Sequence, residues 1–257
     1  MHQDEFVLRH IGPSESETNK MLASLEVDSI EELLRQTIPQ EIRLMSPLSL
    51  SKGISENKFL KELRTLSDEN KLFETYIGLG YHPTVTPAVI QRNILENPGW
   101  YTAYTPYQAE IAQGRLEALF NFQTMVCDLT GMELSNASLL DESTAAAEAM
   151  SMIFAIRSRD QKKNNSSKLF VSDQVLPQTL AVLKTRATPL EIELVVGSEK
   201  DFDYDESFFG ALFQYPGKFG EIIDLQSAVD KAKILGIKTI VAADLLSLTL
   251  LEAPGQY

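Results

Sequence analysis

The sequence has few of the residues that cross-link proteins or hold metal ions. It contains one cysteine, Cys127, and three histidines, His2, His10 and His82. A single cysteine excludes an internal disulfide, and the apolar segment around Cys127 predicts a buried, reduced thiol. The three histidines are scattered along the chain and show no metal-ligand spacing. The sequence therefore predicts neither a disulfide framework nor a metal centre.

Positive charge is also scarce. Lys and Arg number 23 against 36 Asp and Glu, which gives a net charge of -13 and disfavours a nucleic-acid partner. No apolar run approaches the ~20 residues of a membrane span. The first residues, MHQDEF, include no signal-like apolar segment. We therefore expect a cytoplasmic protein that binds neither nucleic acid nor membrane.

The N-terminal region predicts short helices and an extended arm. Ser14 and Glu17 have the spacing of a capping box, Asp28 can cap a second helix, and a third helix is expected from Glu56. Residues 43–53 include apolar side chains but no helical pattern. We expect this arm to contact a partner or another domain, because alone it cannot bury those side chains.

A helix is expected over residues 108–129, and its apolar residues are not confined to one stripe. Such a helix is usually buried on more than one side, so we predict a core element. Gly114 within it costs roughly 1 kcal/mol relative to Ala, which suggests that close backbone packing compensates.

Strands and helices alternate in the rest of the chain. The expected strands are 168–173, 191–196, 211–216 and 238–244, and the expected helices are 144–159, 177–186 and 224–235. This alternation predicts an α/β domain with a predominantly parallel sheet. Functional groups in such sheets lie beyond the carboxyl ends of the strands, which places Asp173, Tyr215 and Asp244 along one edge. We divide the chain into a helical region, 1–80, and an α/β domain, 81–257.

A turn of small residues leads into the helix expected at Ser143 and Thr144. Free N–H groups and the helix dipole make such a turn a typical phosphate site. Asp141 and Glu142 lie in the same turn and would repel phosphate. The sequence therefore suggests a cofactor-binding fold in which this site no longer binds an anion.

Three segments carry a resemblance to a known family: LRHIGPSESE at 8–17, the stretch from IGLGYHP to AAAEAM at 77–150, and VAADLLSLTLLEAPGQY at 241–257. They resemble the N-terminal portion of the glycine-cleavage-system P proteins, the decarboxylating glycine dehydrogenases. The resemblance covers essentially the whole chain. It implies the fold of fold-type-I transferases that depend on pyridoxal phosphate (PLP), here truncated at the C-terminus.

The resemblance also implies an activity and partners. The family uses PLP to decarboxylate glycine and passes the aminomethyl group to the lipoyl arm of the H protein. The lysine that binds PLP belongs to a second, catalytic half, and none of residues 245–257 is a lysine. We therefore expect this chain to be inactive alone and to bind no PLP. Its expected partners are the catalytic half and the H protein, within a homodimer or heterotetramer.

Two groups of candidate residues follow from the resemblance. Those expected to line the substrate channel are Tyr104, Thr105, Tyr107, Gln108, Glu110, Asn136 and Ser138. The tyrosines can instead serve aromatic packing at an interdomain seam. This half of the enzyme is then a non-catalytic lobe that shapes the channel or docks the lipoyl protein.

The second group would lie at a vestigial cofactor position: Ser143, Thr144, Leu176 and Asp244. In the family, an Asp at a late strand end pairs with the pyridine nitrogen of PLP. Asp244 can instead cap the turn that follows its strand. The family usually has His at the position of Leu176 and Gly or Ala at that of Ser143. Leucine cannot stack on the cofactor as an aromatic ring could, which favours a lobe without cofactor.

Overall fold

The computed structural model describes residues 10, 12–46, 48–102, 105–200 and 202–257. The chain forms two units, Met1–Glu74 and Thr75–Tyr257. These units reflect which residues pack together and do not separate one fold from another. The division into a helical region, 1–80, and an α/β domain, 81–257, therefore stays a prediction.

The first unit consists of short helices: α2 (Glu15–Ser24), α3 (Ile30–Thr37), the 3-10 turn η1 (Gln40–Ile42) and α4 (Glu56–Asp68). The capping box at Ser14 is confirmed, because Glu17 N–H donates to Ser14 Oγ and Ser14 N–H to Glu17 Oε2. The cap of α3 is Ser29, and the expectation of Asp28 is wrong. The extended backbone of Ser29 aims its hydroxyl at Glu32 N–H, 3.1 Å away.

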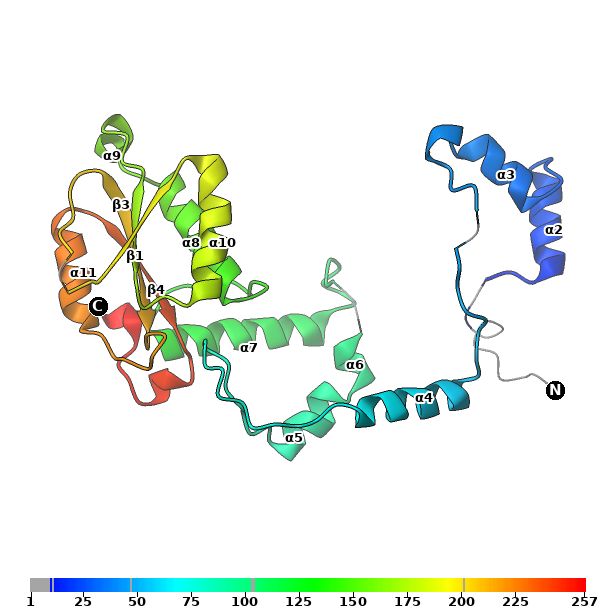
Figure 1. The fold of residues 1–257 in the computed structure, drawn as a ribbon, viewed down its shortest axis with the longest axis horizontal. Coiled ribbons are helices and arrows are strands. Elements are labelled where there is room, and N and C mark those ends of the chain that lie inside the picture. Colours follow the sequence, from blue (N-terminus) through cyan, green and yellow to red (C-terminus); the bar gives the residue numbers. More distant parts are fainter. Residues whose placement is uncertain (1–9, 11, 47, 103–104, 201) are drawn as a thin grey trace. The chain divides into compact units, whose positions relative to one another are not determined.

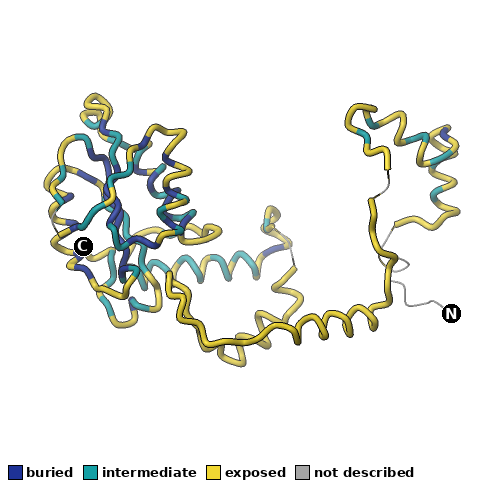
Figure 2. The backbone as a smooth tube through the Cα atoms, viewed as in Figure 1, coloured by how far each residue is buried: buried dark blue, intermediate teal, exposed yellow. Residues whose placement is uncertain are grey.

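The described apolar residues of the arm are exposed. Leu48 has 69% of its surface accessible, and Leu44, Met45 and Leu50 are similar. Figure 2 shows this unit almost entirely as exposed chain. Nothing among its described residues covers the arm, so the arm's contact with a partner stays a prediction.

The second unit begins with α5 (Ala88–Ile90), the π-helical turn η2 (Gln91–Leu95), α6 (Pro98–Tyr101) and the long helix α7 (Gln113–Thr130). Helix α7 begins five residues later than expected, because residues from Gln108 form turns that end at Ala112.

Helix α7 is not the core element that its composition predicts. Each of its residues is half-buried or exposed: Phe120 is 66% exposed and Cys127 is half-buried. No atom lies within 4 Å of the position that a Cβ on Gly114 would take, so the expected close packing there is absent among the described residues. An apolar composition shows what a helix is able to pack against, but neighbouring elements decide how much of it they cover.

The α/β part contains the expected alternation. Its helices are α8 (Glu142–Ala155), α9 (Arg159–Lys163), α10 (Pro177–Ala187) and α11 (Leu225–Ile234), with 3-10 turns η3 (Thr188–Leu190), η4 (Ser247–Thr249) and η5 (Pro254–Gln256). Its strands are β1 (Lys168–Ser172), β2 (Glu193–Gly197), β3 (Phe208–Tyr215) and β4 (Lys238–Ala243). The four strands are parallel in the order β2-β1-β3-β4, so the predicted α/β class with a parallel sheet is confirmed. Figure 1 shows α11 on one side of the sheet and α8 and α10 on the other.

Helices cover both faces of this sheet. Alternate residues of a strand point to opposite faces. Leu169 and Val171 therefore pack with α8 and α10, whereas Phe170 packs with α11. Strand β3 is buried along its whole length. This two-sided core holds the carboxyl ends of β3 and β4 in fixed positions.

Candidate functional site

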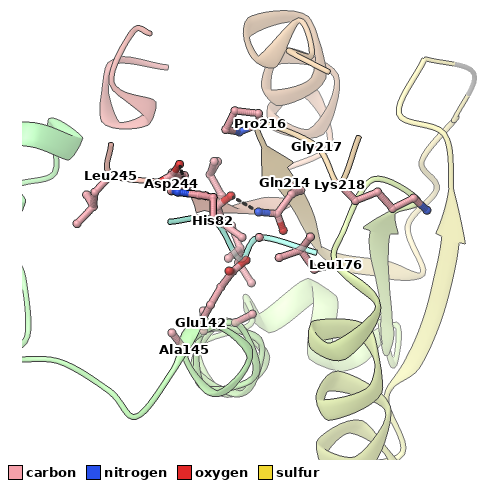
Figure 3. Close-up of a pocket in the computed structure, with 17 residues that line it drawn as sticks. His82, Glu142, Ala145, Leu176, Gln214, Pro216, Gly217, Lys218, Asp244 and Leu245 are labelled. Atoms are coloured by element: carbon pink, nitrogen blue, oxygen red, sulfur yellow. Dashed lines mark hydrogen bonds and ion pairs between the residues drawn. The ribbon is translucent and has the colours of Figure 1, made fainter. Parts of the chain in front are cut away.

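A pocket of about 730 Å³ lies beyond the carboxyl ends of β3 and β4. Its walls come from the loop at Gly80, the start of α8, Leu176 before α10, and the residues that follow the two strands. Parallel α/β sheets place ligand sites at this edge. Figure 3 shows His82, Glu142, Gln214 and Asp244 around the same space.

Asp244 is held by its own turn. Its N–H donates to Tyr215 O at 3.0 Å, and its Oδ1 accepts from Leu246 N–H at 3.0 Å. This is the turn-capping role that the sequence analysis gave as the alternative to a cofactor role for Asp244. The second oxygen, Oδ2, lies 3.8 Å from His82 Nε2, which is too long for a direct hydrogen bond. Asp244 therefore caps a turn and also presents a carboxylate oxygen to the pocket.

His82 is a site residue that the sequence analysis missed. A tight turn from Gly78 to Tyr81 brings it to the strand ends, and Gln178 Nε2 fixes that turn by donating to Leu79 O at 2.7 Å. Gly80 has φ +82°, and a Cβ there would lie 2.8 Å from Leu176 Cδ1. Two glycines flanking one residue are a turn signal, and they could have indicated a loop folded onto another element.

Gln214 was missed as well, and no signal in the sequence marks it. It is 5% exposed and lies one residue before the end of β3. Its Nε2 donates to Ala242 O at 3.1 Å, whereas its Oε1 has no hydrogen-bond partner among the described residues. An unpartnered buried acceptor is uncommon in folded proteins and asks for an explanation.

The start of α8 differs from the predicted phosphate turn. The helix begins at Glu142, with Asp141 as its cap. Asp141 Oδ1 accepts from Thr144 N–H at 2.7 Å, and hydrogen bonds from Thr144 hold the pKa of Asp141 below its ordinary value. Ser143 is buried, with its Oγ 3.1 Å from Thr179 Oγ1. A carboxylate of the chain itself thus uses the helix N-terminus that a phosphate would need.

PLP, which the family resemblance implies, does not fit this pocket. Leu176 is buried under Gly80 and has no flat face for a ring. Lys218 lines the pocket, but its Nζ donates to Asp173 O at 2.5 Å. Glu142, another lining residue, would repel a phosphate. Of the vestigial candidates, Leu176 and Asp244 therefore meet in the pocket, whereas Ser143 and Thr144 bond elsewhere.

The channel candidates are only partly brought together. Thr105 and Ser138 line one cavity of about 490 Å³ with Trp100 and Phe122. Glu110 belongs to a separate shallow pocket on α7, and Tyr107 is 88% exposed. Gln108 and Asn136 are exposed, and Tyr104 lies outside the described residues. A role for these seven residues in a channel stays a prediction.

The three residues expected along the strand-end edge do not form one site. They follow or end three parallel strands, as expected, but Asp173 lies outside the pocket wall and Tyr215 is buried in the core beneath it.

None of the described helices combines the length and apolar character that crossing a bilayer requires.

Comparisons with known proteins agree with one another. The chain is 60% identical over 256 residues to the glycine dehydrogenases (decarboxylating) of Christiangramia forsetii and Flavobacterium johnsoniae. The relative from Nostoc punctiforme is 52% identical over 252 residues. The chain spans 27% of the length of the first two and 25% of the third.

A solved structure is similar over nearly the whole chain. It is the crystal structure of glycine decarboxylase (P-protein) of the glycine cleavage system in inhibitor-bound form. The two share a TM-score of 0.83 and 30% identity, over 96% of this chain and 55% of that one. The family model for the glycine cleavage system P-protein matches residues 8–257. Because that match takes in almost every residue, the chain belongs to the glycine cleavage system P-protein family.

Proposed function

We propose that this chain is the N-terminal part of an enzyme that decarboxylates glycine and transfers the aminomethyl group to the lipoyl arm of an H protein. The observation that carries the proposal is the 60% identity, over the whole chain, to decarboxylating glycine dehydrogenases. In such an enzyme PLP supplies an electron sink for the electrons left when carbon dioxide departs.

Within that enzyme we assign the chain a supporting part. The strand-end pocket offers Leu176 where a ring would stack, and at the start of α8, which borders the pocket, the Asp141 carboxylate accepts from the N–H of Thr144 that a phosphate would need. The lysine amine at its wall, that of Lys218, is already hydrogen-bonded to a backbone carbonyl. These features support binding of PLP by another part of the protein, and they support inactivity of this chain on its own.

The contribution we propose for this chain is to the substrate channel. The cavity next to α7 brings the hydroxyls of Thr105 and Ser138 together with the rings of Trp100 and Phe122. Hydroxyls can orient a small polar substrate, and rings beside them can exclude water. Loops on a rigid α/β scaffold are where such groups concentrate.

An alternative role for the same surface is to dock the lipoyl H protein. Tyr107 is almost fully exposed beside the cavity, and exposed aromatic residues commonly anchor protein interfaces. A cytoplasmic location and a homodimer or heterotetramer belong to the same proposal.

The test uses the full-length protein with substitutions that remove a hydroxyl and keep the shape of the side chain. In Thr105→Val and Tyr107→Phe we expect glycine decarboxylation to fall about tenfold, which equals about 1.4 kcal/mol of transition-state stabilisation. Thr124→Val is the matched control, because Thr124 is exposed on α7 and bonds to Phe120 O. Its activity should not change.

The two roles give different kinetics. A loss in turnover with free glycine supports the channel, whereas a higher KM for the H protein with normal turnover supports docking. Unchanged kinetics in both variants would contradict both roles. The 257-residue chain, supplied with PLP, glycine and H protein, should release no carbon dioxide, and measurable release would refute its supporting role.

A further inference from the structure

The cavity of about 490 Å³ next to α7 has one charged side chain in its wall, that of Arg115. The other described residues that line it are apolar or carry hydroxyls, and none of them is an acid. Arg115 is half-buried and lies in the first turn of α7. A positive side chain at that end of a helix is unfavourable beside the helix dipole. The position of Arg115 therefore suggests a partner that α7 itself does not supply.

The guanidinium of Arg115 keeps most of its hydrogen-bonding capacity. Its Nη2 donates to Gly99 O at 2.9 Å, which holds the group next to Trp100 in the cavity wall. No other hydrogen bond or ion pair joins Arg115 to the described part of the chain. A guanidinium presents several N–H donors as a rigid fork, and this fork matches the two oxygens of a carboxylate.

The rest of the wall suits a small carboxylic acid. Thr105 and Ser138 add hydroxyls, which can donate to the same carboxylate or bond to another polar group of the ligand. Trp100, Leu119 and Phe122 present rings and alkyl surface that reduce the access of water. Hydrogen bonds between charged groups are stronger where water is scarce. A cation without a carboxylate would meet the charge of Arg115 and no acid.

We propose that Arg115 makes this cavity a binding site for a small carboxylate, and that glycine occupies it through its carboxylate before the reaction. Carboxylate binding depends on this chain alone, whereas the identification of glycine rests on the proposed function. Glycine loses its carboxylate as carbon dioxide, so an ion pair with Arg115 would stabilise the bound substrate more than the transition state. Arg115 therefore holds glycine in the channel and takes no part in breaking the bond.

The first test is a titration of the 257-residue protein, followed by 1H–15N NMR at constant ionic strength. The probes are acetate, glycine, acetamide, which has the shape of acetate without its charge, and methylammonium, which resembles glycine without its carboxylate. A ligand with few non-hydrogen atoms binds weakly, so the Kd expected for acetate and for glycine is about 10 mM. Acetamide and methylammonium should bind at least about tenfold more weakly, because neither carries a carboxylate.

Three variants locate the binding. Arg115→Gln removes the charge, and Arg115→Lys keeps the charge without the fork. Acetate binding should weaken about tenfold in Arg115→Gln and by less in Arg115→Lys. Arg159→Gln is the matched control, because Arg159 is exposed at the start of α9 and lies outside the cavity wall, so binding should stay as in the unmodified protein. If circular dichroism shows that Arg115→Gln is unfolded, Arg115→Lys decides the outcome.

The second test measures glycine decarboxylation by the full-length protein. An interaction that holds substrate before the reaction affects KM, whereas one made only in the transition state affects kcat. Arg115→Gln should therefore raise KM for glycine about tenfold with kcat almost unchanged, and Arg159→Gln should match the unmodified enzyme. An unchanged KM, or a lower kcat at the same KM, would contradict the place given to glycine.

The two tests separate this inference from the proposed function. Equal binding of acetamide and acetate, equal losses in Arg115→Gln and Arg159→Gln, or no saturation at about ten times the expected Kd would overturn the carboxylate site. Decarboxylation that depends on Thr105, without any binding of acetate, would refute the inference and leave the proposed function intact. If the full-length protein does not decarboxylate glycine, the proposed function fails and glycine with it, and acetate binding still decides the site.

Discussion

Replacing Gly210 by alanine tests how tightly the core of the sheet is packed against α8. Gly210 lies on β3, and a Cβ there would be 2.3 Å from Ile153 Cδ1 and 2.9 Å from Leu169 Cδ1. Both neighbours are buried, so neither can turn towards solvent. The added methyl must therefore displace packed side chains.

The expected cost can be estimated from two opposing effects. Forcing an extra methyl into a packed core costs about 1–3 kcal/mol. Alanine also restricts the unfolded chain, which returns about 0.4–1 kcal/mol. At the middle of both ranges, Gly210→Ala should lower the free energy of unfolding by about 1.3 kcal/mol. Urea unfolding followed by circular dichroism measures this difference, with the slope checked for a change in unfolding mechanism.

Two further variants make the reasoning refutable. Ile153→Val removes the Cδ1 atom that lies closest, at its own cost of about 0.5–1.5 kcal/mol, so Gly210→Ala should cost clearly less in that background, where only the contact with Leu169 Cδ1 remains. Gly197→Ala is the matched control on β2, because its Cβ would be in ordinary contact, 3.6 Å from Phe170. If Gly210→Ala is as stable as Gly197→Ala, or costs the same with Val at 153, the packing argument is wrong.

Three other outcomes are expected. Gly114→Ala should stabilise the 257-residue chain in urea unfolding by at most about 1 kcal/mol, the value for a helix interior, because Gly114 is the second residue of α7; destabilisation in the full-length protein alone would reveal a close backbone contact there. Burial, with the nearby Glu199 carboxylate, raises the pKa of Tyr204 above its ordinary value of about 10. The neutral phenol therefore stabilises the fold below that pH, and stability is lost as pH rises through the folded-state pKa. Unfolding measured at increasing pH should show a smaller loss in Tyr204→Phe. Exposed side chains on α7, such as Phe120 and Met125, predict binding of a hydrophobic dye, and a monomer that binds none at high concentration would contradict this.

Local signals in the sequence determined much of the secondary structure. The capping box at Ser14 lies where the spacing predicts it, and Pro177 opens α10. Strands β1 and β4 agree with the expected ranges to within a residue. These features depend on side chains a few residues apart, or on the alternation of apolar residues along one strand, so a short stretch contains the information.

Family membership could also be predicted from the sequence, because long stretches of specific residues carry the resemblance.

The sequence could not decide what occupies the N-terminus of α8. The segment predicts a helix, but either the Asp141 carboxylate or a bound anion can satisfy the first N–H groups of such a helix. Only the structure shows that Asp141 accepts from Thr144 N–H.

The tertiary structure alone decided which residues line the pocket and how little of α7 is covered. His82 lies 3.8 Å from Asp244 although the two are far apart in the sequence, and Gln214 donates to Ala242 O on the neighbouring strand. Gly255 approaches the end of α7 so closely that a Cβ would lie 2.3 Å from Gly131 O. Hydrophobic periodicity states which face of an element can be buried, whereas the partner that covers it depends on the path of the whole chain, which no local pattern contains.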